Sequence, residues 1–457
     1  MVFSSITFLY YFLPWVLAVY FLVPAKYKNV VLLVSSLFFY GWGEPKIVFL
    51  MLLTILVSYI SGIFMEKDSK NKKVYMSLAL VFCLGSLGYF KYADFFIGSI
   101  NAATGLSLSL LRVALPVGIS FYTFQVLSYN IDVYRGTVPV QKNLIHLATY
   151  ITMFPQLIAG PIVRYQNVME QLEHRVHNIG KIALGIRRFI LGLSKKVLLA
   201  NAFGELCTVF HASDERSVLF YWMYAAAFTL QIYFDFSGYS DMAIGLGKIL
   251  GFDLMENFHY PLISKSITEF WRRWHISLGS WFKDYVYIPL GGSRVKPVRR
   301  YVNILIVWML TGLWHGAAWN FVIWGLYFAV FLIIEKAVLL KYLECWKVLN
   351  HVYVIMTVVL SFVIFDATSM GNAVMNIGGI FGIGGISLVS AEAIYYLKSY
   401  FVLFLIAILG VTPLPKYLCG KTKWTEYFEP AVLIALLVIV TAYLVDGSFN
   451  PFLYFRF

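Results

Sequence analysis

The stretch from Tyr301 to Ile334 contains no Asp, Glu, Lys or Arg, and this uncharged run constrains the fold more than any other feature of the sequence. As one helix it would be roughly 51 Å long at about 1.5 Å per residue, well beyond the roughly 30 Å of hydrocarbon in a bilayer. Backbone inside a membrane has to satisfy its own hydrogen bonds. The stretch is therefore predicted to be helical and embedded in a membrane.

A break in this helix is expected within residues 311–316, where Gly312 and Gly316 lie on either side of His315. Irregular backbone at membrane depth is tolerated where it is buried in protein or lines a wet cavity. An ionisable side chain at that depth is a functional hypothesis by default, although a neutral histidine bonded to a helix carbonyl is the simpler alternative. We expect His315 to face a pocket rather than lipid.

Apolar runs recur along the whole chain of 457 residues, of which 60% are hydrophobic and 13% charged, with a mean hydropathy of +0.76. This composition excludes an ordinary soluble domain and predicts an all-α polytopic membrane protein. About 11 spans are expected, together with re-entrant pieces. The runs lie at residues 6–23, 29–43, 47–64, 74–90, 115–131, 217–234, 302–334, 350–365, 395–411 and 430–445.

The net charge of +13 comes from basic residues in short loops between the apolar runs. This distribution is typical of positive-inside topology, so we expect membrane lipids and no nucleic acid as partners. Two hydrophobic segments separate Lys26 and Lys28 from the lysines of residues 67–73, which places both groups in the cytoplasm and the N-terminus outside. A final helix over 430–445 then carries the C-terminus to the outer face.

No low-complexity linker or internal repeat divides the chain, so one membrane domain over residues 1–457 is the simplest prediction. Met1–Val23 lacks a basic n-region and a small-residue cleavage site, and we interpret it as a retained first helix. The cysteines have neither metal-ligand nor disulfide spacing, and no metal site is expected; they are Cys83, Cys207, Cys345 and Cys419.

The least lipid-like part of the chain is its middle, from about Asp235 to Arg300. Within it, residues 266–282 are predicted to form one helix, with Ser266 as the N-cap and Glu269 in the first turn. Helical spacing would place one set of residues on the same side of this helix, namely Trp271, Trp274, His275, Leu278 and Phe282. Asp235 and Asp241 are six residues apart, too far for a paired-carboxylate site on one helix face. They are expected to cap a helix that starts near Ser240.

A basic cluster follows the Pro-Leu-Gly-Gly turn of residues 289–292 and precedes the uncharged stretch; it consists of Arg294, Lys296, Arg299 and Arg300. A cytoplasmic anchor for the next span is the commoner role of such a cluster. Contact with the phosphates of an anionic cytosolic donor is the alternative, because Arg and Lys are the usual phosphate partners.

Four sequence blocks occur in the same order as in a known family: Phe154–Pro161, Asp235–Met242, Asn257–Arg294, and Gly312–Gly316 followed by Trp319 and Asn320. On these blocks the chain resembles the membrane-bound O-acyltransferases, in particular the bacterial alginate O-acetyltransferase type. It is also similar to the D-alanyltransferases of teichoic acid.

The resemblance implies a bundle of helices, thinned in the middle, with a central funnel or tunnel where a cytosolic acyl thioester meets an acceptor from the opposite side. It implies that His315 is catalytic and that His275 matches the family's second histidine. It also implies a bacterial cytoplasmic (inner) membrane, no bound cofactor, and acetyl-CoA as donor substrate, with a carrier-protein thioester as the alternative. An exported hydrolase-like acetyltransferase partner and an envelope polysaccharide acceptor complete the expected system.

Acyl transfer to a hydroxyl needs a base, and burial favours the neutral histidine that can accept a proton. We assign that role to His315, while His275 has either a catalytic or positioning role or packs at the interface. Asn320 either orients groups in the pocket or bonds across helices. The pocket and donor-binding candidates are Trp274, Trp314, Asn320, Arg272, Arg273, Arg294, Arg299 and Arg300.

The C-terminal tail, residues 446–457, is aromatic to its last residue and is expected outside the cytoplasm. An interfacial aromatic belt is the simple explanation. The tail also resembles the tyrosine-containing segment that serves as an acyl relay in related transfer systems. By that analogy Tyr454 would receive the acyl group with His315 as base and pass it on, because a phenol with a pKa of about 10 leaves readily.

The sequence thus predicts a membrane O-acetyltransferase that moves an acetyl group from a cytosolic thioester across the membrane to an envelope polysaccharide such as alginate or peptidoglycan. Transfer of D-alanine to teichoic acid is the alternative within the same enzyme class. A proton- or solute-coupled transporter is the alternative from another class, with His315 as relay. A transporter predicts paired broken segments in two related halves, which the sequence does not show.

Overall fold

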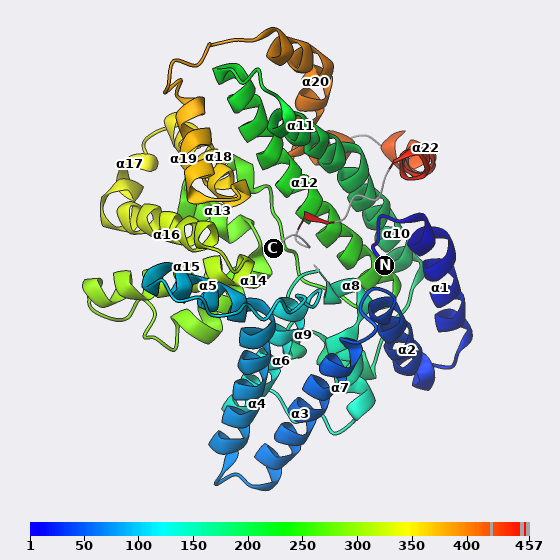
Figure 1. Ribbon diagram of the computed structural model, residues 1–457. Coiled ribbons are helices and arrows are strands. Elements are labelled where there is room, and N and C mark those ends of the chain that lie inside the picture. Colours follow the sequence, from blue (N-terminus) through cyan, green and yellow to red (C-terminus); the bar gives the residue numbers. More distant parts are fainter. Residues whose placement is uncertain (159, 421–423, 448–451, 454–457) are drawn as a thin grey trace. The chain divides into compact units, whose positions relative to one another are not determined.

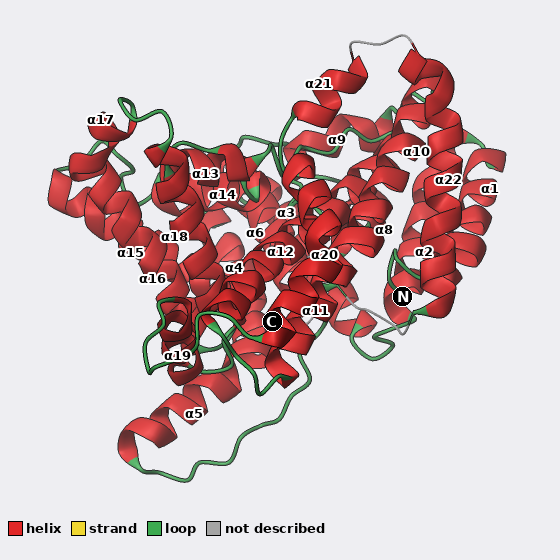
Figure 2. Cartoon of the chain, turned by 90° about the horizontal axis from the view of Figure 1, so that it is seen from above, coloured by secondary structure: helices red, strands yellow, loops and turns green. Residues whose placement is uncertain are grey.

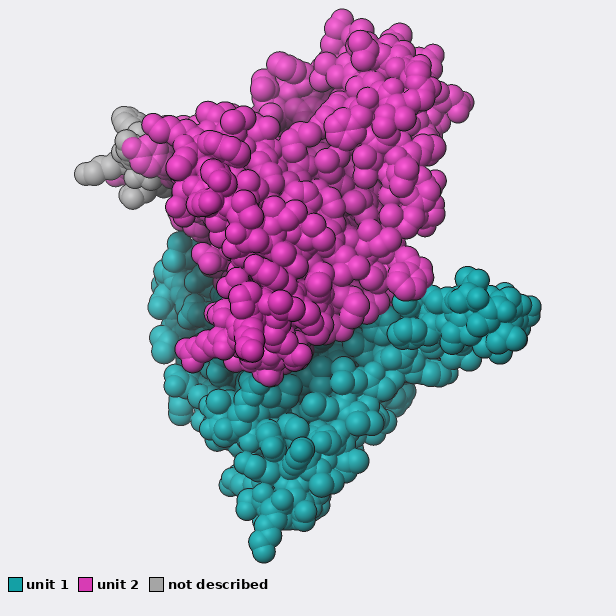
Figure 3. All heavy atoms as spheres, turned by 90° about the vertical axis from the view of Figure 1, so that its left-hand side faces the viewer, with its two compact units in different colours: residues 1–189, 240–255 teal, residues 190–239, 256–457 magenta. Residues whose placement is uncertain are grey.

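Helices make up the regular structure of residues 1–158, 160–420, 424–447 and 452–453, the part of the chain that this computed structural model describes (Figures 1 and 2). Strands are absent from these ranges, which confirms the predicted all-α class. The described residues divide into two compact units, coloured separately in Figure 3. Unit 1 comprises residues 1–189 and 240–255, and unit 2 comprises residues 190–239 and 256–457. That residues 1–457 act as one membrane domain stays a prediction.

Unit 1 is held by helix pairs and by polar contacts buried between them. Helix α3 packs on α4, α4 on α6, and α2 on α7. The amide of Asn29 donates to the carbonyl oxygen of Leu172, and that of Asn130 donates to the hydroxyl of Ser58. Its helices are η1 (Thr7–Phe12), α1 (Leu13–Leu22), η2 (Ala25–Tyr27), α2 (Lys28–Gly41), α3 (Val48–Lys67), α4 (Lys72–Leu87), η3 (Gly88–Tyr92), α5 (Ala93–Thr104), α6 (Ile119–Arg135), α7 (Leu144–Thr152), α8 (Phe154–Leu157) and α9 (Tyr165–Glu173).

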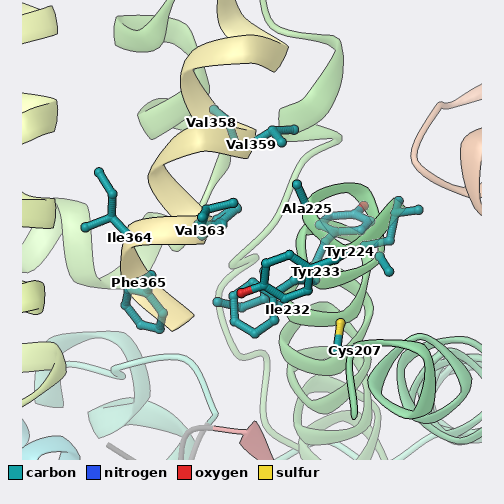
Figure 4. Packing of buried hydrophobic residues seen from close by; sticks show 14 of the residues in the cluster. Cys207, Tyr224, Ala225, Ile232, Tyr233, Val358, Val359, Val363, Ile364 and Phe365 are labelled. Atoms are coloured by element: carbon teal, nitrogen blue, oxygen red, sulfur yellow. The ribbon is translucent and has the colours of Figure 1, made fainter. Parts of the chain in front are cut away.

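Unit 2 is built around a large apolar core to which α12, α16 and α18 contribute. Figure 4 shows part of this core, with side chains of α18 and of α12 projecting into it. Helices α10 (Ile179–Ser194) and α12 (Val218–Ile249) contribute residues to both units. The remaining helices are η4 (Lys195–Ala200), α11 (Asn201–Ala212), η5 (Pro261–Ile263), α13 (Ile267–Arg273), α14 (Ile276–Phe282), η6 (Lys283–Tyr287), α15 (Pro297–His315), α16 (Trp319–Ile334), η7 (Glu335–Leu339), α17 (Leu340–Leu343), α18 (Leu349–Asp366), α19 (Met370–Ile380), α20 (Ala391–Gly410), α21 (Leu414–Gly420) and α22 (Trp424–Asp446).

Within the described residues, 6 helical segments are long and apolar enough to cross a membrane. They are Val48–Lys67, Lys72–Thr104, Trp319–Leu343, Leu349–Asp366, Ala391–Gly410 and Tyr427–Asp446. A shorter apolar helical segment, Thr7–Leu22, precedes them. The chain is a multi-pass membrane protein, and its total of about 11 spans stays a prediction.

Helix α12 corrects one expectation from the sequence. Asp235 and Asp241 were expected to cap a helix starting near Ser240, but both lie inside α12, which runs without interruption from Val218 to Ile249. Each carboxylate has a cationic partner: Asp235 pairs with Lys196 at 2.5 Å, and Asp241 pairs with Arg188 at 2.8 Å. Paired in this way, the two charges are tolerated in a helix interior.

The predicted break in the uncharged stretch is confirmed. Helix α15 ends at His315 and α16 begins at Trp319, so the two helices form a hairpin. Their backbones approach so closely that a Cβ atom on Gly312 would lie 2.2 Å from the carbonyl oxygen of Phe321. A Cβ atom on Gly325 would lie 2.2 Å from the carbonyl oxygen of Trp308. Glycine at these two contacts therefore sets the position of His315 at the end of α15.

Replacement of Gly312 by alanine tests this hairpin. The added methyl group has to separate α15 from α16, so Gly312→Ala is expected to lower stability by about 1–3 kcal/mol and to displace His315. Thermal unfolding of the purified protein in detergent measures the effect. Gly85→Ala is the matched control, because a Cβ there meets nothing within 4 Å and alanine favours the helix. Equal midpoints for Gly312→Ala and the wild-type protein would contradict the close packing.

Candidate active site

The segment that carries His275 is not the single helix predicted over residues 266–282. The N-cap at Ser266 is confirmed, since its hydroxyl accepts from the amide of Glu269 at 3.0 Å. Helix α13 ends at Arg273, however, and α14 begins at Ile276. His275 lies between them in the left-handed region, with φ 46° and ψ 52°. A non-glycine residue is held there only by strong surrounding contacts, so the break is a built feature of the site.

Asn257 provides those contacts. Its main-chain carbonyl accepts from the amide of Ile276 at 3.0 Å. Its side-chain Oδ1 accepts from the amide of Ser277 at 3.1 Å and from the Ser277 hydroxyl at 2.8 Å. His275 Nδ1 lies 3.2 Å from the same oxygen. Asn257 thus fastens both the turn and the imidazole.

This geometry assigns the tautomer of His275. Because the Ser277 amide is a donor, the Asn257 atom that faces it is the oxygen, and the oxygen can only accept from His275. The proton of neutral His275 therefore resides on Nδ1, and Nε2 carries the lone pair. His275 is 1% exposed, and burial lowers its pKa to about 3. At neutral pH it is an uncharged hydrogen-bond acceptor at Nε2.

A buried carboxylate supports α13 from the other side. Glu335, which begins η7, accepts from the amides of Ile267 and Thr268 at 2.5 and 2.8 Å and from the Thr268 hydroxyl at 2.6 Å. A carboxylate at a helix N-terminus satisfies otherwise unpaired amides and suits the helix dipole. Glu335 thus ties the helix before His275 to the helix that continues α16.

His315 is 4% exposed and lies against aromatic rings. Its ring centroid is 4.9 Å from that of Trp324 and 5.5 Å from that of Phe365, both in edge-on contact. The His275 ring lies 6.5 Å away, between centroids. Two sequence-predicted histidines separated by forty positions are therefore brought together in one buried cluster of unit 2.

The pocket candidates with aromatic or amide side chains lie in different parts of unit 2. Trp314 belongs to the cluster, with its ring 5.1 Å from His315 and 5.8 Å from His275. Trp274 is buried in the apolar core, where it stacks on Phe270 at 5.5 Å. Asn320 bonds across helices, because its amide donates to the carbonyls of Phe365 and Ala367 at the end of α18.

The arginine candidates also separate. Arg273 binds Glu269 at 2.7 Å and donates to the carbonyl of His259, so it braces the loop before the site. Arg294 and Arg299 are exposed near the start of α15. Arg272 and Arg300 both lie close enough to Lys336 to repel it electrostatically. This basic group lies toward the opposite end of α15 from His315, about 22 Å from it by helix rise between residues 300 and 315.

Sequence reasoning missed Asn257 and Phe236 as parts of the site. Phe236 packs its ring edge-on against His275 at 4.6 Å. An asparagine in a polar loop resembles an ordinary turn residue, and only its position at the start of a recognisable block singled it out. Tyr454, the relay candidate, lies outside the described residues.

Comparison with known families matches residues 138–373 to the membrane-bound O-acyltransferase family, a range that includes both histidines and Asn257. A probable alginate O-acetylase of Azotobacter vinelandii is 37% identical over the whole of both chains. The chain belongs to the membrane-bound O-acyltransferase family. It is an O-acyltransferase, as its sequence predicted.

Two further relatives have names that refer to other envelope polymers. A peptidoglycan O-acetyltransferase of Helicobacter pylori is 33% identical over 87% of this chain and 83% of its own length. A teichoic acid D-alanyltransferase of Bacillus subtilis is 30% identical over 47% of this chain and 57% of its own length. The chain is thus similar to membrane acyltransferases that act on envelope polymers.

The low pKa of His275 predicts a pH dependence of stability. An unfolded histidine has a pKa of about 6.5 and binds a proton as pH falls below that value, whereas folded His275 stays neutral until pH approaches its pKa of about 3. Its contribution to stability is therefore complete above about pH 6.5 and is lost progressively below it. Melting midpoints in detergent from pH 7.5 to 4.5 should fall less in His275→Gln than in the wild-type protein. Parallel pH curves for the two proteins would show that His275 does not titrate in this way.

Proposed function

We propose that this chain is an O-acetyltransferase that takes an acetyl group from a cytosolic thioester, with acetyl-CoA as the donor, and delivers it across the bacterial inner membrane for O-acetylation of an envelope polysaccharide. The observation that carries the proposal is the pair of buried histidines, His275 and His315, with ring centroids 6.5 Å apart inside the family-matched region. Full-length similarity to O-acetylases favours acetyl over D-alanyl transfer.

The two histidines take different roles in this proposal. His275 has its Nδ1 proton committed to Asn257 and a pKa of about 3, so it is a poor base at neutral pH. Its Nε2 lone pair suits it to accept a hydrogen bond from a donor group of the bound substrates other than the attacking hydroxyl, and so to position them. His315 acts as the general base: it takes the hydroxyl proton as the oxygen attacks the thioester carbonyl. The carbon–sulfur bond then breaks, and the proton passes to the leaving thiolate.

The basic group at the start of α15 is proposed as the entrance for the donor. Arg272, Arg300 and Lys336 converge there, with the exposed Arg294 and Arg299 nearby in sequence. Such cations suit phosphate groups. The distance of about 22 Å along α15 requires a donor whose charged end and thioester lie far apart, joined by a slender arm. Acetyl-CoA and a carrier-protein thioester both meet this requirement.

The acceptor side follows from the expected topology and the relatives. With both termini outside the cytoplasm, Tyr454 would take the acetyl group from the donor as a phenyl ester. An exported hydrolase-like partner would then move it to the polysaccharide. The alginate and peptidoglycan enzymes among the relatives make those polymers the first candidates.

Replacement of His315 tests the proposal. In a deletion strain, His315→Ala and the size-matched His315→Gln should restore at most about one-hundredth of the polymer acetylation that the wild-type gene restores, because loss of a general base typically costs 10² to 10⁴ in rate. Acetate released by mild alkali from each purified envelope polymer gives the measurement, normalised to the amount of protein in the membrane. His174→Ala, at an exposed site, is the control. Full acetylation with either His315 variant would overturn the assignment of the base.

The relay is tested separately with Tyr454→Phe. This change removes the hydroxyl that would carry the acetyl group and preserves the ring, so acetyl export should fall to near the level of the His315 variants while protein abundance is unchanged. Mass spectrometry of the C-terminal peptide after incubation with acetyl donor should show one acetyl group on the wild-type tail and none on the variant. Normal export by Tyr454→Phe would exclude the relay and leave the role of His315 open to direct transfer.

A further inference from the structure

The described end of the chain is buried in unit 2. Phe452 is 2% exposed and Leu453 is 5% exposed. The amide of Leu453 donates to Oδ2 of Asp235 at 2.8 Å, a buried hydrogen bond between positions far apart in the sequence. A hydrogen bond to an ionised carboxylate is among the stronger ones that a backbone amide can make.

Asp235 is held by a second contact. Its Oδ1 lies 2.5 Å from Nζ of Lys196, and the two side chains are 2% and 4% exposed. The pair exists because α10 and α12 cross closely: a Cβ on Gly238 would lie 2.7 Å from the carbonyl oxygen of Gly192. Lys196 lies one turn after Gly192 and Asp235 lies one turn before Gly238, so the crossing brings the two side chains together. Lys196 lies in η4, a π-helical turn of the kind that often occurs at functional sites.

Aromatic contacts connect the same segment to the histidine cluster. The ring of Phe452 lies 4.8 Å from that of Tyr239 and 5.8 Å from that of Phe236. Phe236 in turn contacts His275 at 4.6 Å. Helix α22, which precedes the tail, packs on η4. We call Lys196, Asp235, Phe236 and Tyr239 the tail seat.

We propose that Asp235, charged and oriented by Lys196, is a positioning residue that holds Phe452 and Leu453 beside the histidine cluster, and that acyl transfer depends on this contact. This inference rests on the proposed function and adds a residue pair with a defined role to it. A buried ion pair is a costly way to gain stability, since apolar replacements often stabilise as well or better. The second carboxylate oxygen of Asp235, Oδ2, accepts the hydrogen bond from the main-chain amide of Leu453. This main-chain hydrogen bond acts together with the aromatic contacts of Phe452.

The seat itself is tested by hydrogen–deuterium exchange of the C-terminal peptide in the purified full-length protein. Two double variants remove the charges together, so neither leaves a lone buried ion. Lys196→Met with Asp235→Asn keeps an amide oxygen that can accept from Leu453, and its tail should exchange within a few-fold of wild type. Lys196→Met with Asp235→Leu has no acceptor, and exchange at residues 452 and 453 should rise about tenfold or more. Equal exchange in the two double variants would overturn the seat.

The dependence of transfer on the seat is tested at Leu453, which follows α22, so a change there leaves the main-chain hydrogen bonds of the helices intact. Leu453→Pro removes the amide proton, whereas Leu453→Met keeps both the proton and the side-chain volume. With acetyl-CoA as donor, Leu453→Pro should lower kcat about tenfold or more relative to Leu453→Met, at unchanged donor KM.

The outcomes separate the two proposals. Wild-type activity in Leu453→Pro, in a protein whose His315→Gln variant is inactive, overturns the role of the seat and leaves the proposed function standing. Wild-type protein that shows no transfer dependent on His315 overturns the proposed function, whereas the exchange experiment still decides whether Asp235 holds the tail.

Discussion

Polar groups buried in an apolar chain need hydrogen-bond or ionic partners, and the geometry of the candidate site depends on how this chain supplies several of them. In hydrocarbon or in a dry protein core, an unpaired amide or charge costs several kcal/mol. The chain meets this need by joining segments that are distant in sequence: Glu335 with the start of α13, Asp235 with Lys196, and Asn257 with the turn at His275. Each of these contacts fixes an element that carries or borders a histidine. The bonds that pair these buried polar groups are therefore the same bonds that hold the elements of the candidate site in place.

The features predicted from sequence are those whose physical cause is local. Continuous apolar runs predicted the helices, and Gly312 and Gly316 predicted the break that leaves His315 at the end of α15. Ser266 and Glu269 predicted the correct helix start. In each case the residues responsible lie within one or two turns of their effect, which is the range that propensity, capping and periodicity describe.

The features that sequence reasoning missed are caused by contacts with residues that are distant in the sequence. Trp271, Trp274 and His275 are spaced as in one helix, yet the backbone turns at His275 because Asn257 accepts from the next turn. Asp235 and Asp241 are of a residue type that often caps helices, yet they lie inside α12, where Lys196 of η4 and Arg188 of α10 neutralise them. No local pattern contains these partners. The pairing of His275 with His315 depends on the same long-range contacts, which is why each histidine could be proposed alone but their proximity could not.

The surroundings of the two histidines explain why the proposed site needs both. An imidazole whose pKa is far below neutrality accepts a hydrogen bond without taking the proton, so in the proposed mechanism His275 can position a substrate throughout a catalytic cycle and stay unchanged. His315 lies at the end of α15, against the rings of Trp314, Trp324 and Phe365. His275 is locked by Asn257 into a single tautomer, which suits it to act as a fixed hydrogen-bond acceptor. In the proposed mechanism the role of the base that gains and loses a proton therefore goes to His315.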